Sequence, residues 1–228
     1  MTSKPTRVIG ISGRMGAGKD TVADILSREF GFAKVALADP IKRVVREIYD
    51  FSIDSLWGPS ELRNSPDPRY PRDHEFIGEA CACCGSQEFN TPCFLTPRWA
   101  LQVTGTQMGR RLYENTWIDT GLRVAESLLR PNSVQRYLAP VGLISRPQDP
   151  PVQGVAIPDI RFKNEMRALK ARGLKIVRIR RAAAETKSTH QSETEQLSIP
   201  DSEFDWVVNN NGNIDDLTEQ LTTIFGEP

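Results

Sequence analysis

The strongest constraint on this 228-residue chain is a glycine-rich loop near its start. Residues 13–19, GRMGAGK, fit the pattern G-x-x-x-x-G-K between an apolar run at 8–12 and a segment with helical spacing at 20–30. Glycines let successive backbone N–H groups turn toward one phosphate, and the helix N-terminus adds the positive end of its dipole. Lys19 would reach the β- and γ-phosphates. The loop therefore predicts nucleotide binding in an α/β domain, the alternative being a merely flexible glycine turn.

Further strands and helices are predicted to alternate along the chain. The pair Asp39–Pro40 is a good helix opening, with Asp as N-cap and Pro at the first helical position. Alternation of this kind predicts a mostly parallel sheet covered on both faces. Strands are expected at 32–37, 152–157, 174–179 and 204–208, and helices at 20–30, from 39, from 96, at 119–129, 164–172 and 214–225; residues 140–151 read as a proline-rich connection.

Composition and charge exclude several classes of protein. The chain is 39% hydrophobic and 25% charged, and its 29 basic and 29 acidic residues cancel. Zero net charge argues against a nucleic-acid partner, whose binding would rest on excess positive charge. Apolar windows fall short of the ~18 residues that a membrane span needs. The start lacks the pattern of a secretory signal, so we expect a cytoplasmic protein.

Basic residues are concentrated in one block. Six of them lie between Lys170 and Arg181, without an acidic residue among them. Such a block in a neutral protein suits a small anionic ligand, and the alternative is a solvated helix face.

Two carboxylates are candidates for holding Mg²⁺. Position 20 is Asp where the loop pattern usually has Ser or Thr, and the hydroxyl follows at Thr21. Asp20 could hold the ion directly or through water, Thr21 could serve instead, or Asp20 could be first-turn helix charge. Asp159 follows the strand predicted at 152–157, where it would hold the hydration shell of the ion. The alternative for Asp159 is a turn aspartate.

An ordered set of motifs gives the chain a family resemblance. GKDTVADIL (18–26), LADPIK (37–42) and TPRWALQVTGTQMGR (96–110) are followed by DIRFKNE (159–165), HQSE (190–193) and VNN (208–210). Together these segments resemble the phage-type deoxynucleoside monophosphate kinases, bacteriophage-type members of the P-loop nucleotide kinase superfamily. The resemblance covers most of the chain except about 50–95 and 131–151. The Asp at position 20 is itself similar to what this family shows.

The resemblance implies an enzyme of deoxynucleotide metabolism and nucleotide biosynthesis. It would transfer the γ-phosphoryl group of ATP to a deoxynucleoside 5′-monophosphate, with Mg²⁺. The implied fold is one three-layer α/β/α kinase domain over 1–228, with a five-stranded parallel sheet in the order 2-3-1-4-5. Residues 50–95 would form an insertion on the substrate side, and 181–200 a lid. The partners implied are the two nucleotides and a second copy of the chain, as a homodimer.

Site residues follow from the need to hold two anionic phosphates in line and to neutralise their repulsion. Arg98, Gln102 and Arg110 are spaced near one face of a predicted helix, and two guanidinium forks with an amide suit a monophosphate and a base edge. Their alternative is a solvated helix face. The ATP-binding set is Gly13, Arg14, Met15, Gly16, Ala17, Gly18, Lys19, Asp20 and Thr21; the substrate-binding set is Asp39, Lys42, Arg98, Gln102, Arg110 and Trp117; the catalytic set is Lys19, Arg161, Arg180 and Arg181; the Mg²⁺ set is Asp20, Thr21 and Asp159.

Several of these residues have ordinary alternatives. Asp39 could be a plain N-cap. One of the three arginines in the catalytic set would stabilise charge on the transferring phosphoryl group. Trp117, with Trp99 and Tyr113, is a candidate wall against a ribose 2′-hydroxyl, although aromatic residues are more often core. His190 in the lid is more often incidental than functional.

All four cysteines lie within thirteen residues. Such clustering predicts a metal site or nothing, rather than disulfides. Zinc needs four ligands; Cys81, Cys84 and Cys93 supply three, and Cys83 or His74 could be the fourth. Cys83 and Cys84 are adjacent, which makes ligation by both awkward and tips the balance toward unliganded thiols in a loop.

Overall fold

A computed structural model provides the structure of the chain. It describes residues 8–88, 90–130, 133–146, 151–184, 196 and 198–226. The chain forms two compact units, which we call the sheet unit and the helical unit. The sheet unit comprises Met1–Leu37, Ile118–Leu138 and Leu143–Pro228, and the helical unit comprises Ala38–Trp117 and Ala139–Gly142.

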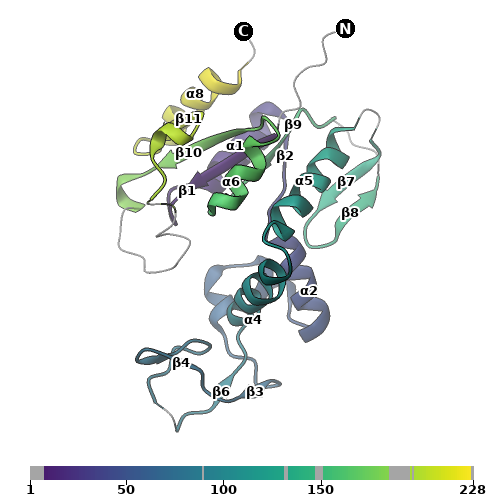
Figure 1. The fold of residues 1–228 in the computed structure, drawn as a ribbon. Helices are drawn as coiled ribbons and strands as arrows, with labels where there is room; N and C mark the ends of the chain where they lie inside the picture. Colours follow the sequence, from purple (N-terminus) through teal and green to yellow (C-terminus); the bar gives the residue numbers. More distant parts are fainter. Residues whose placement is uncertain are drawn as a thin grey trace. The chain divides into compact units, whose positions relative to one another are not determined.

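Five parallel strands form the centre of the sheet unit (Figure 1). Their order across the sheet is β11-β10-β1-β9-β2, which is 2-3-1-4-5 when these five are counted along the chain. The predicted topology is therefore confirmed. In this parallel register Gly13 at the end of β1 pairs with Ile179 near the end of β10, so the loops after these strands leave from one edge. The strands are β1 (Val8–Gly13), β2 (Phe32–Lys34), β9 (Gly154–Ile157), β10 (Lys175–Arg180) and β11 (Trp206–Asn209).

Helices cover both faces of this sheet. Successive strand residues point to opposite faces. Ile9 and Ile11 pack in one core cluster with α1 (Lys19–Phe30) and α8 (Ile214–Phe225). Gly10 faces the other way, where a Cβ would lie 2.6 Å from the side chain of Leu169 on α6 (Lys163–Lys170). This is the predicted three-layer α/β/α arrangement.

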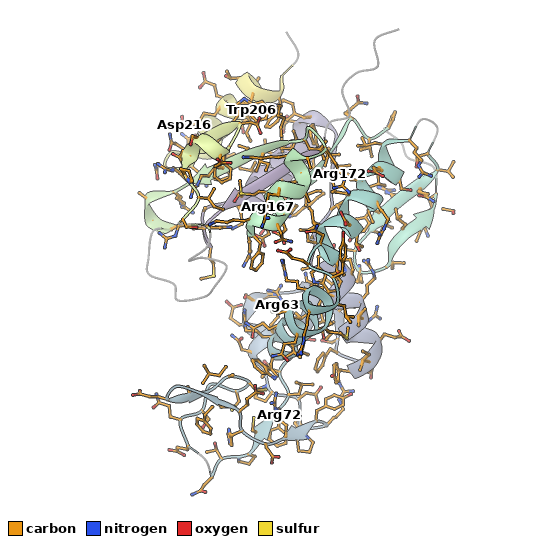
Figure 2. All side chains as sticks on the ribbon, viewed as in Figure 1. Arg63, Arg72, Arg167, Arg172, Trp206 and Asp216 are labelled. Carbon is orange, nitrogen blue, oxygen red and sulfur yellow. The ribbon has the colours of Figure 1, made fainter. Side chains whose placement is uncertain are left out.

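The remaining elements of the sheet unit connect these layers. Helix α5 (Thr116–Leu129) is joined to the region after α6 by an ion pair between Asp119 and Arg172 (Figure 2). Two further strands, β7 (Gln135–Leu138) and β8 (Gly142–Ser145), pair with each other. Part of the proline-rich connection expected at 140–151 is thus a strand. Short 3₁₀ turns lie at Ala182–Ala184 and Asp201–Glu203.

Three helical segments and several very short strands make up the helical unit. Helices α2 (Asp39–Tyr49), α3 (Ile53–Trp57) and α4 (Pro97–Val103) contribute Val45, Leu56 and Ala100 to one buried cluster with Phe51. A 3₁₀ turn spans Ser60–Asn64, and a π-helical segment, Thr104–Arg110, continues directly from α4. The strands β3 (Pro71–Arg72) and β6 (Cys93–Phe94) pair antiparallel, as do β4 (Phe76–Ile77) and β5 (Ala80–Cys81).

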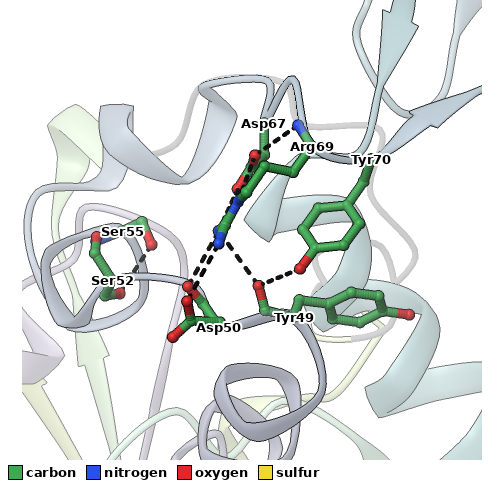
Figure 3. Close-up of polar contacts among 7 residues, drawn as sticks. All are labelled: Tyr49, Asp50, Ser52, Ser55, Asp67, Arg69 and Tyr70. Carbon is green, nitrogen blue, oxygen red and sulfur yellow. Dashed lines mark hydrogen bonds and ion pairs between the residues drawn. The ribbon is translucent and has the colours of Figure 1, made fainter.

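Arg69 ties the start of the irregular region to the end of α2 (Figure 3). Its guanidinium pairs with Asp67 at 2.7 Å and with Asp50 at 3.2 Å. The hydroxyl of Tyr70 donates to the carbonyl of Tyr49 at 2.7 Å. The hydrogen bond from Arg69 holds the pKa of Asp67 below its usual value, against the smaller opposing effect of burial. These contacts fix a segment in which the sequence shows little periodicity.

Candidate active site

The phosphate loop leads directly into the N-terminus of α1, which has no side-chain cap. Gly18 is the N-cap of α1 at φ 95°, a left-handed conformation that glycine adopts without strain. It brings no capping side chain, so the first N–H groups of α1 are available to an anion. Lys19 is 7% exposed, and its Nζ donates to the carbonyl of Arg14 at 2.8 Å. The loop therefore has the backbone and the cation that a polyphosphate requires.

Asp159 lies beside this lysine. It follows β9, and its carboxylate is 3.2 Å from Nζ of Lys19 and 2.8 Å from Nη2 of Arg161. Burial raises the pKa of Asp159, but the charges of Arg161 and Lys19 outweigh burial and hold the pKa below its usual value. The carboxylate is thus charged at neutral pH, at the edge where β1 and β9 end.

Arg161 is positioned by Glu165. The buried carboxylate of Glu165 accepts from the backbone N–H of Arg161 at 2.8 Å and of Phe162 at 3.1 Å. The motif DIRFKNE therefore folds as one unit, in which Glu165 fixes the turn that presents Asp159 and Arg161. The role of Glu165 was not predicted from the sequence.

Asn210 is a second residue that the sequence reasoning missed. Its Nδ2 donates to the carbonyl of Ala17 at 2.8 Å, so the loop after β11 holds the phosphate loop. The signal for it was the VNN motif, which ends the last strand at the same edge as Gly13. Asn211 accepts from the N–H of Ala182 at 2.8 Å and joins the turn after β10 to the same region.

Asp20 is engaged elsewhere. Its carboxylate is 81% exposed and pairs with Lys34 on β2 at 2.8 Å. This is the arrangement expected of first-turn helix charge, one of the alternatives drawn from the sequence. Thr21, in the same helical turn, is half-buried. The oxygen donors of Thr21 and Asp159 fit Mg²⁺, which prefers oxygen ligands.

The arginines in the last part of β10 and just after it differ in what they contact. Arg180 pairs with Asp201 at 2.8 Å, and Arg178 pairs with the same carboxylate at 2.9 Å. Arg178 also donates to the carbonyls of Ile199 and Gln196 and lies over the ring of Phe204. Arg181 is exposed. Arg161 alone among the predicted catalytic arginines has a contact with Asp159 within the described part of the chain.

The predicted lid falls mostly outside the described residues. Residues 185–195 and 197, including His190, are not described. The two ends of the predicted lid are described. Arg178 holds the C-terminal end by donating hydrogen bonds to the carbonyls of Gln196 and Ile199.

In the helical unit, Asp39 is not the N-cap that the sequence suggested. The N-cap is Ala38, and Asp39 is the first residue of α2, with Pro40 following. Asp39 is buried and accepts from Nε1 of Trp57 at 2.9 Å, while Nζ of Lys42 lies 3.7 Å from it. The side chain thus turns inward to Trp57, and the backbone of Ala38 starts the helix.

Arg98, Gln102 and Arg110 do not lie on one continuous α-helix, which corrects that prediction. Helix α4 ends at Val103, and the chain continues in π geometry to Arg110. The wider π turn changes the spacing on which the one-face argument depended. Arg98 contacts Asn64 and donates to Oγ of Ser60 at 3.0 Å, and Gln102 is exposed.

Trp117 supports the π-helical segment. Its Nε1 donates to the carbonyl of Gly105 at 2.8 Å, and it is buried. At Gly109 a Cβ would lie 2.1 Å from the Trp117 ring, so only glycine permits this approach. The indole therefore has the core role that was the alternative for Trp117.

A surface pocket also opens on the helical unit, at the end of α2. It is lined by polar and apolar side chains, but by none of the residues predicted to bind substrate. The lining includes Arg46, Ser52, Ser55, Leu62, Arg69 and Pro97.

No helix within the described ranges has the length and apolar character needed to cross a membrane.

Comparison with known proteins supports the motif-based resemblance. A family model described as deoxynucleotide monophosphate kinase matches residues 7–62. A protein of Acanthamoeba polyphaga mimivirus named "Putative deoxynucleotide monophosphate kinase" is 28% identical over 214 residues, covering 94% of this chain and 93% of that protein. These two matches confirm the resemblance drawn from the sequence.

Solved structures are similar at a lower level. Shikimate kinase from Aquifex aeolicus is 12% identical, with 96% of this chain and 99% of that chain covered and a TM-score of 0.43. Dephospho-CoA kinase from Campylobacter jejuni is also 12% identical, with 95% and 94% covered and a TM-score of 0.42. Likeness at this level says nothing about the acceptor of this chain.

Proposed function

Because the chain is a phosphotransferase related to the deoxynucleotide monophosphate kinases, we propose that it transfers the γ-phosphoryl group of ATP to a deoxynucleoside 5′-monophosphate. The products are a deoxynucleoside diphosphate and ADP. The observation that carries this proposal is the grouping of Lys19, Asp159 and Arg161 behind the phosphate loop. A positive cradle with one ionised carboxylate suits a polyphosphate that arrives with a divalent cation.

In this proposal the residues of the sheet unit bind and activate ATP. The backbone of residues 13–18 and Nζ of Lys19 hold the phosphates. Asp159 and Thr21 are the Mg²⁺ ligands we favour, since Asp20 is paired with Lys34. When bound, Mg²⁺ neutralises charge on the β- and γ-phosphate oxygens. Arg161 is the arginine we assign to the transferring phosphoryl group, because it lies against Asp159.

The acceptor is assigned to the helical unit. Arg98 and Arg110 would bind its phosphate, with Gln102 on the base edge. Lys42 would complete the set at the start of α2, and Asp39, which is buried against Trp57, would act by holding Lys42. Trp117 acts on this set indirectly, because its contacts hold the segment that ends at Arg110.

A coupled assay of ADP release against a panel of deoxy- and ribonucleoside monophosphates tests the proposal. We expect ADP release only when a deoxynucleoside monophosphate is present. Release with a ribonucleotide or a coenzyme precursor instead would identify a kinase for another small acceptor. ADP release that is independent of every acceptor would indicate a nucleotide-binding accessory protein, and either result overturns the proposal.

A further inference from the structure

Four side chains of the helical unit converge on one point. The ligand atoms of His74, Cys81, Cys84 and Cys93 all lie within 4.8 Å of one another. The Sγ atoms of Cys81 and Cys93 are 3.8 Å apart, and all four cysteines are free thiols. A disulfide needs about 2.05 Å. Two thiolates held tetrahedrally at about 2.3 Å from one zinc ion lie ~3.8 Å apart, which matches the observed separation.

His74 is oriented for metal binding by its second ring nitrogen. Nε2 lies 2.6 Å from the carbonyl oxygen of Thr91, which can only accept, so Nε2 carries the proton. Nδ1 is then the nitrogen with the free lone pair, and it lies 3.8 Å from Sγ of Cys84. An imidazole held by a backbone carbonyl on one side and facing thiols on the other has the usual geometry of a metal-ligating histidine.

The chain around Cys81 forms a tight turn that presents two ligands. The N–H of Gly85 donates to the carbonyl of Cys81 at 2.8 Å, so Cys81 and Cys84 leave the turn side by side.

Cys83 takes a different direction. Its Sγ donates to the carbonyl of Phe94 at 3.2 Å. The adjacency of Cys83 and Cys84, which argued against a metal site, is therefore no obstacle, because His74 takes the fourth position. The carbonyl of Cys83 also accepts from Oγ1 of Thr96 at 3.1 Å, and Thr96 is the N-cap of α4.

Little else holds this region together. Its strand pairs, β3–β6 and β4–β5, are two residues long on each side. Its small hydrophobic cluster has three buried residues, Cys81, Cys83 and Cys93, with the half-buried side chains of Phe76, Cys84, Leu95 and Trp99 packed against them. Arg72, labelled in Figure 2, lies over the ring of Trp99 on α4, and both side chains are half-buried. A segment with so small a core usually needs a disulfide or a metal ion to fold.

We propose that His74, Cys81, Cys84 and Cys93 bind one structural zinc ion that fixes residues 71–94 and, through Cys83 and Thr96, the N-terminus of α4. Four protein ligands leave no open position, so the ion is structural and not catalytic. Thiolates with one imidazole favour zinc over the oxygen-seeking Mg²⁺. By fixing the start of α4, the ion would also position Arg98 for the acceptor. This last step rests on the proposed function.

Metal analysis of the full-length chain tests the site directly, with adjacent cysteines as a matched pair. The protein, Cys84→Ser and Cys83→Ser are purified from zinc-supplemented cells and measured by elemental analysis. We expect about one zinc per chain in the wild type and in Cys83→Ser, and less than about 0.2 in Cys84→Ser. Wild-type zinc below about 0.1 per chain, or iron in its place, would overturn the proposal. So would equal zinc content in the two variants.

Cobalt substitution identifies the ligands. Co²⁺ in place of zinc is expected to give the intense red-region bands of a tetrahedral ion and a near-ultraviolet thiolate-to-metal band in the wild type and in Cys83→Ser. Loss of these bands in Cys83→Ser, or an octahedral spectrum in the wild type, would contradict the assignment.

ATP binding by the same preparations separates this proposal from the proposed function. A Cys84→Ser chain that binds ATP normally has an intact sheet unit, so loss of its zinc reflects the missing ligand. A zinc-loaded chain that phosphorylates no deoxynucleotide would refute the proposed function and leave the metal site standing. A chain that phosphorylates a deoxynucleotide but contains no zinc would refute the metal site and leave the proposed function standing.

Discussion

Nδ2 of Asn210 donates a 2.8 Å hydrogen bond to the carbonyl of Ala17, a residue 193 positions earlier in the chain. The loop after the last strand of the sheet thereby holds the phosphate loop. The contact also depends on Gly18, since a Cβ there would lie 2.2 Å from the same nitrogen. The shape of the nucleotide site is therefore set partly from the C-terminal end of the sheet.

Replacing Asn210 with Ala should weaken ATP binding. The loss of one hydrogen bond to a loop carbonyl corresponds to about 1 kcal/mol, or roughly fivefold in Kd. Titration calorimetry with ATP measures it. Asn209→Ala is the matched control, because Asn209 is the adjacent residue, at the end of β11, and is exposed. Equal Kd values for the two variants would show that the contact does not shape the site.

Asp159→Asn should abolish most of the turnover while keeping the fold. Asn tolerates the φ of 65° at this position, so the backbone is preserved, but the charge facing Lys19 and Arg161 is lost. We expect kcat to fall by about 10²–10³. The coupled ADP-release assay measures this, with exposed Asp24→Asn as a control. A kcat within about threefold of wild type would remove Asp159 from the mechanism.

Local patterns predicted the fold of the sheet unit well. The strand, loop and helix of residues 8–30 are encoded by neighbours in sequence, and the family motifs supplied the strand order. The pairing of Asp20 with Lys34 could not be predicted in this way, because it depends on where β2 lies beside α1. The contact between Asn210 and Ala17 has the same origin.

Predictions for the helical unit were weaker for a physical reason. The sequence of residues 96–110 predicts an α-helix. In the structure the chain adopts π geometry from Thr104, where Trp117 packs closely against Gly105 and Gly109. Spacing also could not decide between His74 and Cys83 as a metal ligand. That choice depends on the direction of each side chain, which the carbonyls of Thr91 and Phe94 determine.

Arg110→Ala should weaken binding of the acceptor and leave ATP binding unchanged. If Arg110 binds the monophosphate, its removal takes away a charge-assisted hydrogen bond of about 1.5–3 kcal/mol, and KM for the acceptor should rise by at least tenfold. Arg111, exposed next to it, provides the control. Steady-state kinetics with the acceptor varied at saturating ATP measures the difference. An equal rise of KM in Arg110→Ala and Arg111→Ala would indicate a general charge effect.

Asp205→Asn should reduce the stability of the sheet unit in a pH-dependent way. Asp205 accepts from the N–H of Ile176 at 2.9 Å and pairs with Lys175 at 2.7 Å, joining the approach to β11 to the start of β10. Burial raises the pKa of Asp205, but Lys175 and Ile176 outweigh burial and hold the pKa below its usual value. Because the folded state then binds the proton less readily than the unfolded state, this stabilisation is complete above pH ~5 and is lost as pH falls.

The free energy of unfolding in urea, measured for the wild type and Asp205→Asn at several pH values, checks this. We expect a difference of about 1 kcal/mol at pH ~7 that shrinks as the pH falls below ~4. Glu219→Gln, exposed on α8, controls for a change of net charge and should match the wild type throughout. A difference between wild type and Asp205→Asn that stays constant with pH would mean that the carboxylate contributes through shape and hydrogen bonding alone, without its charge.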